Sequence, residues 1–483
     1  MLDLEAPEHT RFPEAAQAVA GSFRDRSGFV FERDGVVFRQ VNECYRAHLE
    51  CAETSGLLAA LMSRKLLVPH EDAPVDQAPQ PGACRLLRPE RVPFVSYPFE
   101  WCFSQLRDAA LLTLDVQRLA LEHGMSLKDA SAYNVQFLRG KPILIDTLSF
   151  ESYTEGAPWV AYRQFCQHFL APLSLMAERD VRLGQLFRVF IDGVPLDLAS
   201  RLLPRTTWLK PAIAMHVHLH ARAQRRYAKG EDRPVRTPRI SRTSALALLA
   251  NLRAAVEALR WTAAGTEWAD YYSETNYSDR AAAEKHRLVG RMLEQARPAS
   301  VWDLGANTGR FSRLASEKGI TTVAFDVDPA AVDRNYRTSV ETGNQHQLPL
   351  VLDLTNPSPG LGWAGTERMS LEARGPAGAI LALALIHHLA IANNVPLDSV
   401  AAFLARNTEH LIIEFVPKSD SQVRRLLASR ADVFDEYTRP GFESAFSRYF
   451  TINASESIAD SERVVYLMRR RAAPRAHDRE LEN

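Results

Sequence analysis

A glycine loop between an apolar strand and a helix constrains the fold of this chain more than any other feature. The stretch VWDLGANTGRFSRLA, residues 301–315, passes from an apolar run through Gly305 and Gly309 into residues with helical spacing. Glycine adopts backbone conformations with positive φ and lets another group approach the backbone closely. A loop of this kind after a buried strand is typical of nucleotide-binding α/β folds.

Apolar runs of strand length recur after this loop, and helical segments separate most of them. The runs SVWDL, TTVAFD, LPLVLDL, AILALAL and LIIEF lie between residues 300 and 415. Such alternation predicts a parallel sheet with helices on both faces. Ligands of these sheets bind beyond the carboxyl ends of the strands, so the residues that follow each run are the candidate site.

The spacing of the loop residues excludes two classes of ligand site. A phosphate-binding P-loop requires GxxxxGK[ST], but no lysine follows Gly309. The dinucleotide fingerprint GxGxxG fits poorly, because three other residues, 306–308, separate Gly305 from Gly309. What remains is a D-x-G-x-x-x-G pattern that begins at Asp303.

This pattern resembles motif I of class I S-adenosylmethionine-dependent methyltransferases, which usually carry a third glycine where this chain has Asn307. The resemblance implies a doubly wound Rossmann-like domain, S-adenosyl-L-methionine as the cofactor, and direct methyl transfer. A helix that begins near Thr308 would offer free N–H groups to the carboxylate of that cofactor. The implied cofactor-binding residues are Asp303, Gly305, Ala306, Asn307, Gly309, Asp326, Val327, Asp353 and Leu354.

Acidic residues also end the next two apolar runs. In the family that the loop resembles, an acid at the position of Asp326 accepts hydrogen bonds from the ribose, and the position of Asp353 contacts the adenine. The alternative for each acid is a turn or a helix N-cap, which we expect for Asp328 before Pro329. Acids at the ends of three successive strands favour the cofactor site.

The fourth run leads into the segment ALIHHLAIANNVPL, which lines the acceptor pocket in the same family. Imidazole titrates near neutral pH, so His387 or His388 is a candidate general base, with packing as the alternative. Asn393 and Asn394 are candidates for orienting the acceptor. Glu414, at the end of the fifth run, is a further pocket candidate.

A second set of polar residues lies in the first half of the chain. Asp129 and Asn134 are spaced as D-x-x-x-x-N, and the hairpin-like run VQFLRGKPILI then leads to Asp146. This order resembles protein kinases and aminoglycoside phosphotransferases, in which these positions are a catalytic base and two metal ligands. The preceding runs, 29–41, 42–61, 92–101 and 103–124, resemble two strands, a helix, a strand with a hinge, and the following helices.

The same region departs from the kinase pattern. Arg39 stands where the phosphate-binding lysine is expected, Thr147 and Leu148 follow Asp146, and no clear glycine-rich loop precedes them. Three interpretations stay open: a degenerate kinase-like domain that binds substrate or positions the methyltransferase, an active phosphotransferase, and an unrelated accessory fold. If the domain is kinase-like, Asp129, Asn134 and Asp146 form its metal and catalytic site; otherwise no metal is expected.

Composition changes along the chain predict its organisation. We expect an accessory α+β domain at 1–220, an arginine-rich linker and a helix at 221–264, the methyltransferase domain at 265–472, and a disordered tail at 473–483. Tyr272 and Tyr277 are candidate lid residues. His216, His218 and His220 alternate as a strand-borne metal site would, but the absence of nearby acids or cysteines favours a helix.

Charge and cysteine content bound the partners. Lys+Arg and Asp+Glu number 58 each, which predicts no nucleic-acid or membrane partner. The five cysteines lack CxxC spacing, and no signal peptide or membrane span is evident, so we expect a cytoplasmic protein. The stretches LKDASAYNVQF and HHLAIANNVPL also resemble bacterial proteins related to nodulation methyltransferases, which implies a small-molecule, carbohydrate or secondary-metabolite acceptor.

Two alternatives to a plain methyltransferase remain at this stage. One is a bifunctional protein that combines kinase-like and methyltransferase activities, and the other is a non-catalytic adaptor that retains both folds. The oligomeric state is left open.

Overall fold

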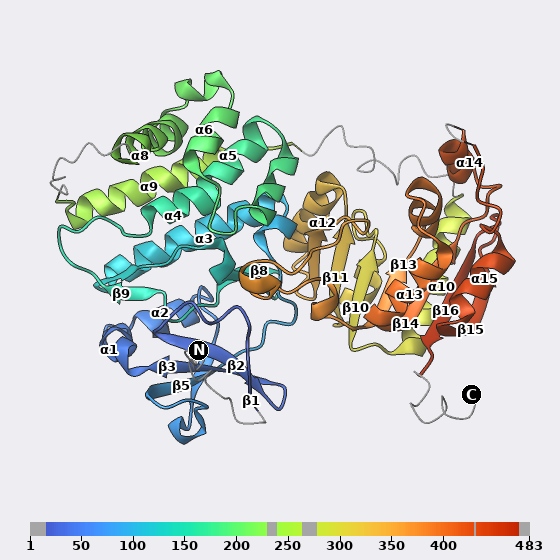
Figure 1. Ribbon diagram of the computed structural model, residues 1–483, viewed down its shortest axis with the longest axis horizontal. Coiled ribbons are helices and arrows are strands. Elements are labelled where there is room, and N and C mark those ends of the chain that lie inside the picture. Colours follow the sequence, from blue (N-terminus) through green and yellow to red (C-terminus); the bar gives the residue numbers. More distant parts are fainter. Residues whose placement is uncertain (1–15, 229–238, 263–277, 429–430, 473–483) are drawn as a thin grey trace, which may run out of the picture. The chain divides into compact units, whose positions relative to one another are not determined.

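The chain forms two compact units, and the computed structural model describes residues 16–228, 239–262, 278–428 and 431–472 (Figure 1). The first unit comprises Met1–Thr262 and Gly360–Arg368, and the second comprises Ala263–Pro359 and Met369–Asn483. The candidate lid residues Tyr272 and Tyr277 and the tail at 473–483 lie outside the described residues. Within the described ranges, no helix combines the length and apolar character needed to cross a bilayer.

A seven-stranded sheet organises the second unit, with strand order β12-β11-β10-β13-β14-β16-β15. Its strands are β10 Ser300–Leu304, β11 Thr321–Asp326, β12 Gln347–Val351, β13 Ala377–Ala382, β14 Thr408–Phe415, β15 Phe450–Ser457 and β16 Val464–Arg470. The first five are parallel, and the β15–β16 hairpin adds two antiparallel strands at one edge. The predicted doubly wound α/β domain is therefore confirmed, and the five predicted strands are its parallel part.

Helices connect the parallel strands and cover both faces of this sheet. They are α10 Asp279–Ala296, α11 Ser312–Ser316, α12 Pro329–Glu341, α13 Leu397–Asn407, α14 Ser421–Leu427 and α15 Arg439–Ser447. The strand order reverses direction at β10, and right-handed crossovers on either side of that reversal place their helices on opposite faces. The predicted helix start near Thr308 is wrong: residues 307–311 form turns, and α11 begins at Ser312.

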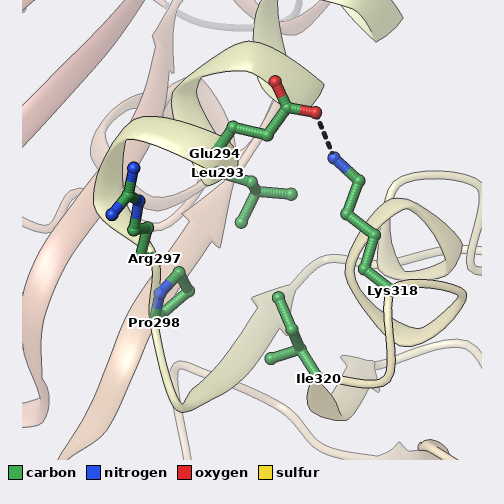
Figure 2. A pocket seen from close by; sticks show the side chains of 6 residues that line it. All are labelled: Leu293, Glu294, Arg297, Pro298, Lys318 and Ile320. Atoms are coloured by element: carbon green, nitrogen blue, oxygen red, sulfur yellow. Dashed lines mark hydrogen bonds and ion pairs between the residues drawn. The ribbon is translucent and has the colours of Figure 1, made fainter.

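A pocket of about 470 Å³ opens at the amino-terminal edge of this sheet (Figure 2). Its lining residues are Leu293, Glu294, Arg297, Pro298, Lys318 and Ile320, and a 2.5 Å ion pair joins Lys318 to Glu294. Arg297 and Pro298 precede β10, and Ile320 precedes β11. Ligands of doubly wound sheets bind at the carboxyl edge, where the acids follow the strands. The pocket lies at the opposite edge of the sheet.

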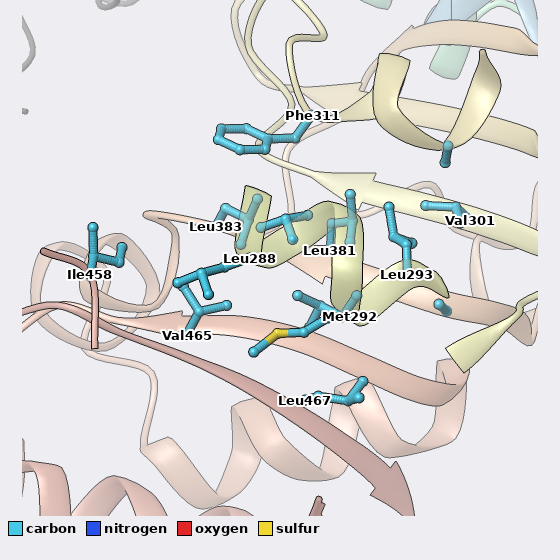
Figure 3. Packing of buried hydrophobic residues seen from close by; sticks show 14 of the residues in the cluster. Leu288, Met292, Leu293, Val301, Phe311, Leu381, Leu383, Ile458, Val465 and Leu467 are labelled. Atoms are coloured by element: carbon cyan, nitrogen blue, oxygen red, sulfur yellow. The ribbon is translucent and has the colours of Figure 1, made fainter. Parts of the chain in front are cut away.

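One buried cluster holds α10 and α11 against the sheet (Figure 3). Leu288, Val289 and Met292 of α10 pack on Leu381 of β13 and Val465 of β16. Burying each such side chain contributes about 1.5–3 kcal/mol. The cluster spans parallel and antiparallel strands, so the hairpin that the sequence analysis did not identify belongs to the same core.

The first unit begins with an antiparallel five-stranded sheet of order β1-β2-β3-β5-β4. Its strands are β1 Ala16–Ala18, β2 Gly28–Arg33, β3 Val36–Asn42, β4 His70–Ala73 and β5 Ala83–Pro89. The two strands predicted at 29–41 are β2 and β3. The single helix expected at 42–61 is interrupted at Gly56, whose φ of 77° separates α1 Arg46–Thr54 from α2 Leu57–Ser63.

Helices and two small strand pairs complete the first unit. The pairs are β6 Met125–Leu127 with β9 Phe150–Ser152, and β7 Val135–Leu138 with β8 Lys141–Leu144. The helices are α3 Phe103–Glu122, α4 Tyr162–Phe165, α5 Ala171–Glu178, α6 Leu196–Leu202, α7 Pro211–Ile213, α8 His220–Ala228 and α9 Arg242–Ala258. The predicted hairpin is confirmed, and Arg139 and Gly140 both have positive φ in its two-residue turn.

Three segments differ from the organisation expected from sequence. The strand expected within 92–101 is absent, and only a short 3-10 turn, Pro98–Glu100, forms there. The first part of the expected linker is helix α8, and α9 belongs to the first unit. His216 and His218 lie within a helical segment, as predicted, and both are buried. Residues Gly360–Arg368, between β12 and β13 in the chain, also belong to the first unit.

The end of α10 generates a stability prediction. Exposed Arg297 caps this helix with φ 46° and ψ 52°, a left-handed conformation that glycine adopts without the Cβ penalty. We expect Arg297→Gly to raise the free energy of unfolding by about 1 kcal/mol, measured by urea denaturation. Arg297→Ala is the control, because it removes the same guanidinium and keeps the strained backbone. Equal stability of the two variants would contradict the prediction.

Candidate functional site

The loop after β10 is held in a conformation that explains its sequence. Gly305, Asn307 and Gly309 have φ of 75°, 50° and 77°. Asparagine tolerates the left-handed region better than most residues, which explains why Asn307 can stand where the resemblance places a third glycine. A Cβ on Gly309 would lie 2.1 Å from the side-chain oxygen of Asn335 in α12, so this position excludes any side chain.

Two buried carboxylates hold this loop from adjacent strands. Asp303 of β10 accepts a 2.6 Å hydrogen bond from the Ser312 hydroxyl, beyond the loop. Asp326, the last residue of β11, accepts the Asn307 backbone N–H at 2.7 Å and the Asp328 N–H at 2.9 Å. The structure therefore brings Asp303, Asp326 and the glycine loop together at the carboxyl edge of the sheet.

Burial changes the acidity of both carboxyls. Desolvation raises the pKa of Asp303 to about 7, and the neighbouring charge of Asp326 acts in the same direction. Desolvation also raises the pKa of Asp326 to about 6, against the hydrogen bonds from the loop. Each shift means that the ionised form lacks the solvation it has in water. A ligand that brings a positive charge or hydroxyl donors to this edge would compensate for that loss.

The remaining predicted cofactor residues lie at the same edge with different surroundings. Asp353 follows β12 by two residues, is partly buried, and accepts hydrogen bonds from the backbone and the hydroxyl of Thr355. Its carboxylate therefore also stabilises a turn, as the alternative interpretation proposed. Val327 is exposed beside Asp326, Leu354 is partly buried, and Ala306 is buried.

The segment after β13 contacts the glycine loop. A Cβ placed on Gly305 would lie 3.3 Å from the Leu385 side chain. His387 is fully buried, and neither of its ring nitrogens has a hydrogen-bond partner among the described residues. Its ring centroid lies 4.1 Å from that of partly buried His388. A buried imidazole without a partner is costly, so this position is a candidate contact for a bound molecule.

The environment of the two histidines disfavours their protonation. Burial lowers the pKa of His388 to about 4, and the nearby Arg463 acts in the same direction. Burial also lowers the pKa of His387 well below its usual range, with His388, Arg463 and Lys285 adding to the effect. Apolar burial and nearby cations therefore disfavour titration of these imidazoles near neutral pH, and a general-base role stays a prediction. Both are neutral at pH 7 and are weak bases.

The two candidate asparagines lie at the end of the segment that carries the histidines. Asn393 follows the short π-helix His388–Ala392, is exposed, and donates its amide to the His388 carbonyl oxygen at 2.8 Å. Asn394 is also exposed and has φ 55°. Their arrangement terminates the helical turn, and an acceptor-orienting role stays a prediction.

A buried ionic network lies beside the histidines, and the sequence analysis identified only its Glu414. This carboxylate, at the end of β14, accepts the Lys285 ammonium at 2.7 Å and the Ala384 backbone N–H at 2.7 Å. Arg463 lies 3.7 Å from Glu414 and forms a 2.8 Å ion pair with Asp420. The sequence did contain a signal for this network. Lys285 lies on the apolar face of α10, between Ala281 and Leu288, where an aliphatic residue is expected.

The kinase-like residues of the first unit also lie close together. Asp146 forms ion pairs with Arg39 of β3 and accepts the Ser149 hydroxyl. Asn134 donates its amide to the same Ser149 oxygen at 3.3 Å. Asp129 accepts the Gln164 amide at 2.7 Å, and burial raises its pKa, with the charge of Asp146 adding to the rise. The order seen in the sequence therefore corresponds to one polar cluster.

Among the residues that the structure describes, no group of three or more histidine, cysteine, aspartate or glutamate side chains is placed to hold a metal ion. His216 and His218 instead have protein partners: His216 contacts Tyr162 and Asn251, and His218 contacts Ser200. These histidines stabilise the packing of the helices.

Comparison with solved structures gives partial likenesses to methyltransferases. The magnesium protoporphyrin IX methyltransferase ChlM from Synechocystis PCC 6803, solved with bound SAH, is 15% identical, covers 42% of this chain and 93% of its own, and has a TM-score of 0.31. The bifunctional kinase-methyltransferase WbdD is 17% identical, covers 41% of each chain, and has a TM-score of 0.28. TM-scores this low support no conclusion about this chain.

Comparison of sequences gives a relative that spans both units. No protein-family model matches the chain. The nodulation protein NoeA of Rhizobium meliloti (strain 1021) is 37% identical over 462 residues, which cover 94% of this chain and 96% of NoeA. An alignment that covers 94% of the chain spans parts of both units. The chain therefore belongs to the family of the nodulation protein NoeA.

Proposed function

We propose that the second unit is an S-adenosylmethionine-dependent methyltransferase that acts by direct transfer on a small-molecule acceptor, a carbohydrate or a secondary metabolite. The observation that carries this proposal is the pair of buried carboxylates, Asp303 and Asp326, on either side of the Gly305 loop. The acceptor class rests on the resemblance to nodulation methyltransferases and on the kinship with a nodulation protein.

The residues present fit the chemistry of this cofactor. An ammonium group near Asp303 would offset the desolvation that raises the pKa of its carboxyl to about 7. The Asp326 carboxylate suits two ribose hydroxyls, and exposed Val327 beside it offers an apolar surface to a purine ring. Asp353 and Leu354 follow the next strand along and complete the proposed adenine contact.

When bound, the cofactor supplies an electrophilic methyl group on a positively charged sulfur. The chain's task is to align the acceptor's oxygen or nitrogen behind that methyl carbon and to exclude water, which contributes most of the acceleration. Methylation of a hydroxyl or amine would release the acceptor's proton, and water would take it up. Neutral His388 can accept a hydrogen bond from the acceptor, while its low pKa makes orientation a larger part of its role than deprotonation.

The ionic network gives the acceptor segment a defined position. Glu414 binds the backbone N–H of Ala384, three residues before His387. Its charge is balanced by Lys285 from α10, and Arg463 lies nearby. A buried carboxylate that loses its partner is costly, so this network keeps the histidine segment beside the glycine loop. Lys285 and Glu414 are positioning residues in this proposal.

A second candidate function concerns the first unit, and the polar cluster of Asp129, Asn134 and Asp146 favours it. In this alternative, the unit binds a nucleoside triphosphate with magnesium and the protein is bifunctional. Arg39 would take the place of the expected lysine against Asp146. A non-catalytic adaptor is the remaining alternative, and it predicts no heat on titration with S-adenosylmethionine.

The cofactor proposal is tested by Asp326→Asn. The variant keeps an oxygen that can accept the hydrogen bond from the Asn307 N–H. It removes the negative charge that would strengthen hydrogen bonds from the ribose hydroxyls. We expect the dissociation constant for S-adenosylmethionine to rise by at least about tenfold in titration calorimetry, as a charge-assisted hydrogen bond is lost. Asp460→Ala is the control, because that carboxylate is half-exposed in a turn before β16. Unchanged affinity of Asp326→Asn would count against the proposal.

The raised pKa values give a pH prediction for the same binding event. The cofactor requires ionised Asp303 and Asp326, whose pKa values are raised to about 7 and about 6, so protons compete with it. Affinity is greatest above both values and falls as the pH drops through them. We expect the dissociation constant at pH 5.5 to exceed that at pH 8 by at least about tenfold. Asp326→Asn, with one titrating group fewer, gives a shallower dependence; a flat wild-type profile contradicts the assignment.

Calorimetry with ATP separates the second candidate from the first. If the first unit binds nucleotide through magnesium, ATP binding depends on the metal, is abolished by Asp146→Ala and is retained by Asp303→Ala. The physical reason is that Asp146 would supply the metal-binding carboxylate, whereas Asp303 belongs to the other unit. Wild-type protein that shows no heat with magnesium and ATP eliminates this function and leaves the methyltransferase proposal intact.

A further inference from the structure

Four large apolar side chains are exposed within twelve residues of the first unit. Trp208, Leu209, Met215 and Leu219 have exposed fractions of 39%, 85%, 53% and 50%. We refer to these four residues as the Leu209 patch. Single exposed apolar residues are ordinary on protein surfaces, whereas a contiguous group marks an interaction site.

The patch is one surface, because its two segments are packed together. Trp208 and Leu209 end a 3-10 helix, Arg205–Leu209, and Met215 and Leu219 lie on the helix that continues into α8 (Figure 1). The Trp208 ring stacks on His218 with centroids 4.4 Å apart, and the Arg222 guanidinium lies 5.0 Å from the same ring.

The burial pattern of this helix assigns it an inner and an outer face. Ile213, His216, Val217 and Ala221 are buried against the unit, and Met215, Leu219 and Arg222 are exposed. Met215 and Leu219 are four residues apart, and Arg222 follows three residues later, so they lie on one side of the helix. The outer face is therefore apolar where a solvated helix carries polar residues.

The sequence that carries the patch is rich in basic residues. Residues 198–225 contain five lysines and arginines and no aspartate or glutamate. Two of these five cations are neutralised by acids that precede the stretch: Arg201 pairs with Asp197, and Lys210 pairs with Glu178. Arg205 and Arg225 are exposed and form no ion pair with a described residue. The neutral net charge, from which no membrane partner was expected, therefore conceals a locally basic surface.

We propose that the Leu209 patch docks the protein on the surface of an anionic lipid bilayer. Leu209 is 85% exposed and therefore protrudes, so the patch is shaped to enter a soft surface rather than to receive a partner's side chain. Tryptophan with leucine and methionine beside arginine is the composition of helices that lie at the boundary between headgroups and acyl chains. Anionic headgroups attract the flanking arginines at close range.

Charge also argues against the simplest protein partner. A second copy of the chain that docked through the same patch would bring two surfaces of the same positive sign together. The bilayer role concerns the first unit and is independent of whether the second unit transfers methyl groups. It places the protein beside a membrane, although no helix of the described residues is long and apolar enough to cross one.

The test is sedimentation of the full chain with phosphatidylcholine vesicles that contain or lack phosphatidylglycerol. We expect binding to the anionic vesicles that weakens as salt is raised, because the arginine contribution is screened. The double variant Leu209→Ser, Leu219→Ser should weaken that binding by at least about tenfold, since two apolar insertions are lost. The double variant Arg205→Glu, Arg225→Glu should weaken vesicle binding more at low salt than at high salt.

Val160→Ser is the matched control, because Val160 is an apolar residue of the same unit that is 61% exposed and outside the patch. Circular dichroism of each variant checks that the fold is retained. The proposal is overturned if the wild-type chain ignores both kinds of vesicle, or if the control weakens binding as much as the double variant. It is also overturned if the double variant abolishes self-association in size-exclusion chromatography and leaves vesicle binding unchanged, which would assign the patch to a second copy.

Discussion

The hydrogen bond from the Asn307 backbone to the Asp326 carboxylate is the interaction on which the candidate site depends. It closes the glycine loop against β11, while the Ser312 hydroxyl ties the far side of the loop to Asp303 of β10. Two desolvated acids on neighbouring parallel strands are unfavourable in isolation, and proteins retain such arrangements mainly where a ligand uses them. The same two hydrogen bonds therefore determine both the backbone conformation of the loop and the positions of the two carboxylates.

A second set of charges organises the other side of that edge. Lys285, Glu414 and Arg463 are buried, and their attraction offsets desolvation only because each has a partner. Through the Ala384 N–H, Glu414 also determines where the segment after β13 leaves the sheet. The position of His387, whose ring nitrogens have no hydrogen-bond partner among the described residues, is thus a consequence of ion pairing in the core. The ion pairs therefore anchor the candidate acceptor segment to the end of β14.

Sequence reasoning succeeded where one local pattern carries the structure. The five parallel strands are continuous apolar runs because both of their faces are covered, and this is readable from composition alone. The β15–β16 hairpin was missed because β15 alternates apolar and polar residues and lacks the continuous apolar run by which the parallel strands were identified. Residues 92–101 were misread as a strand, since Pro93 and Pro98 interrupt a β-rich composition and remove backbone donors. The position of Lys285 on an apolar helix face was readable, but its pairing was not, because its partner Glu414 lies 129 residues away.

The first unit shows how little of a site's chemistry follows from the order of its motifs. Asp129, Asn134 and Asp146 lie in one polar cluster, yet the oxygens of Asp146 already have protein partners. One faces the Arg39 guanidinium and the Leu148 N–H, and the other accepts the Ser149 hydroxyl. A metal ion would have to share this carboxylate with a permanent positive charge, since a guanidinium cannot lose its proton in a protein. The choice between a nucleotide site and a structural cluster is therefore decided by the strength of the Arg39–Asp146 pair, which the spacing of the motif does not encode.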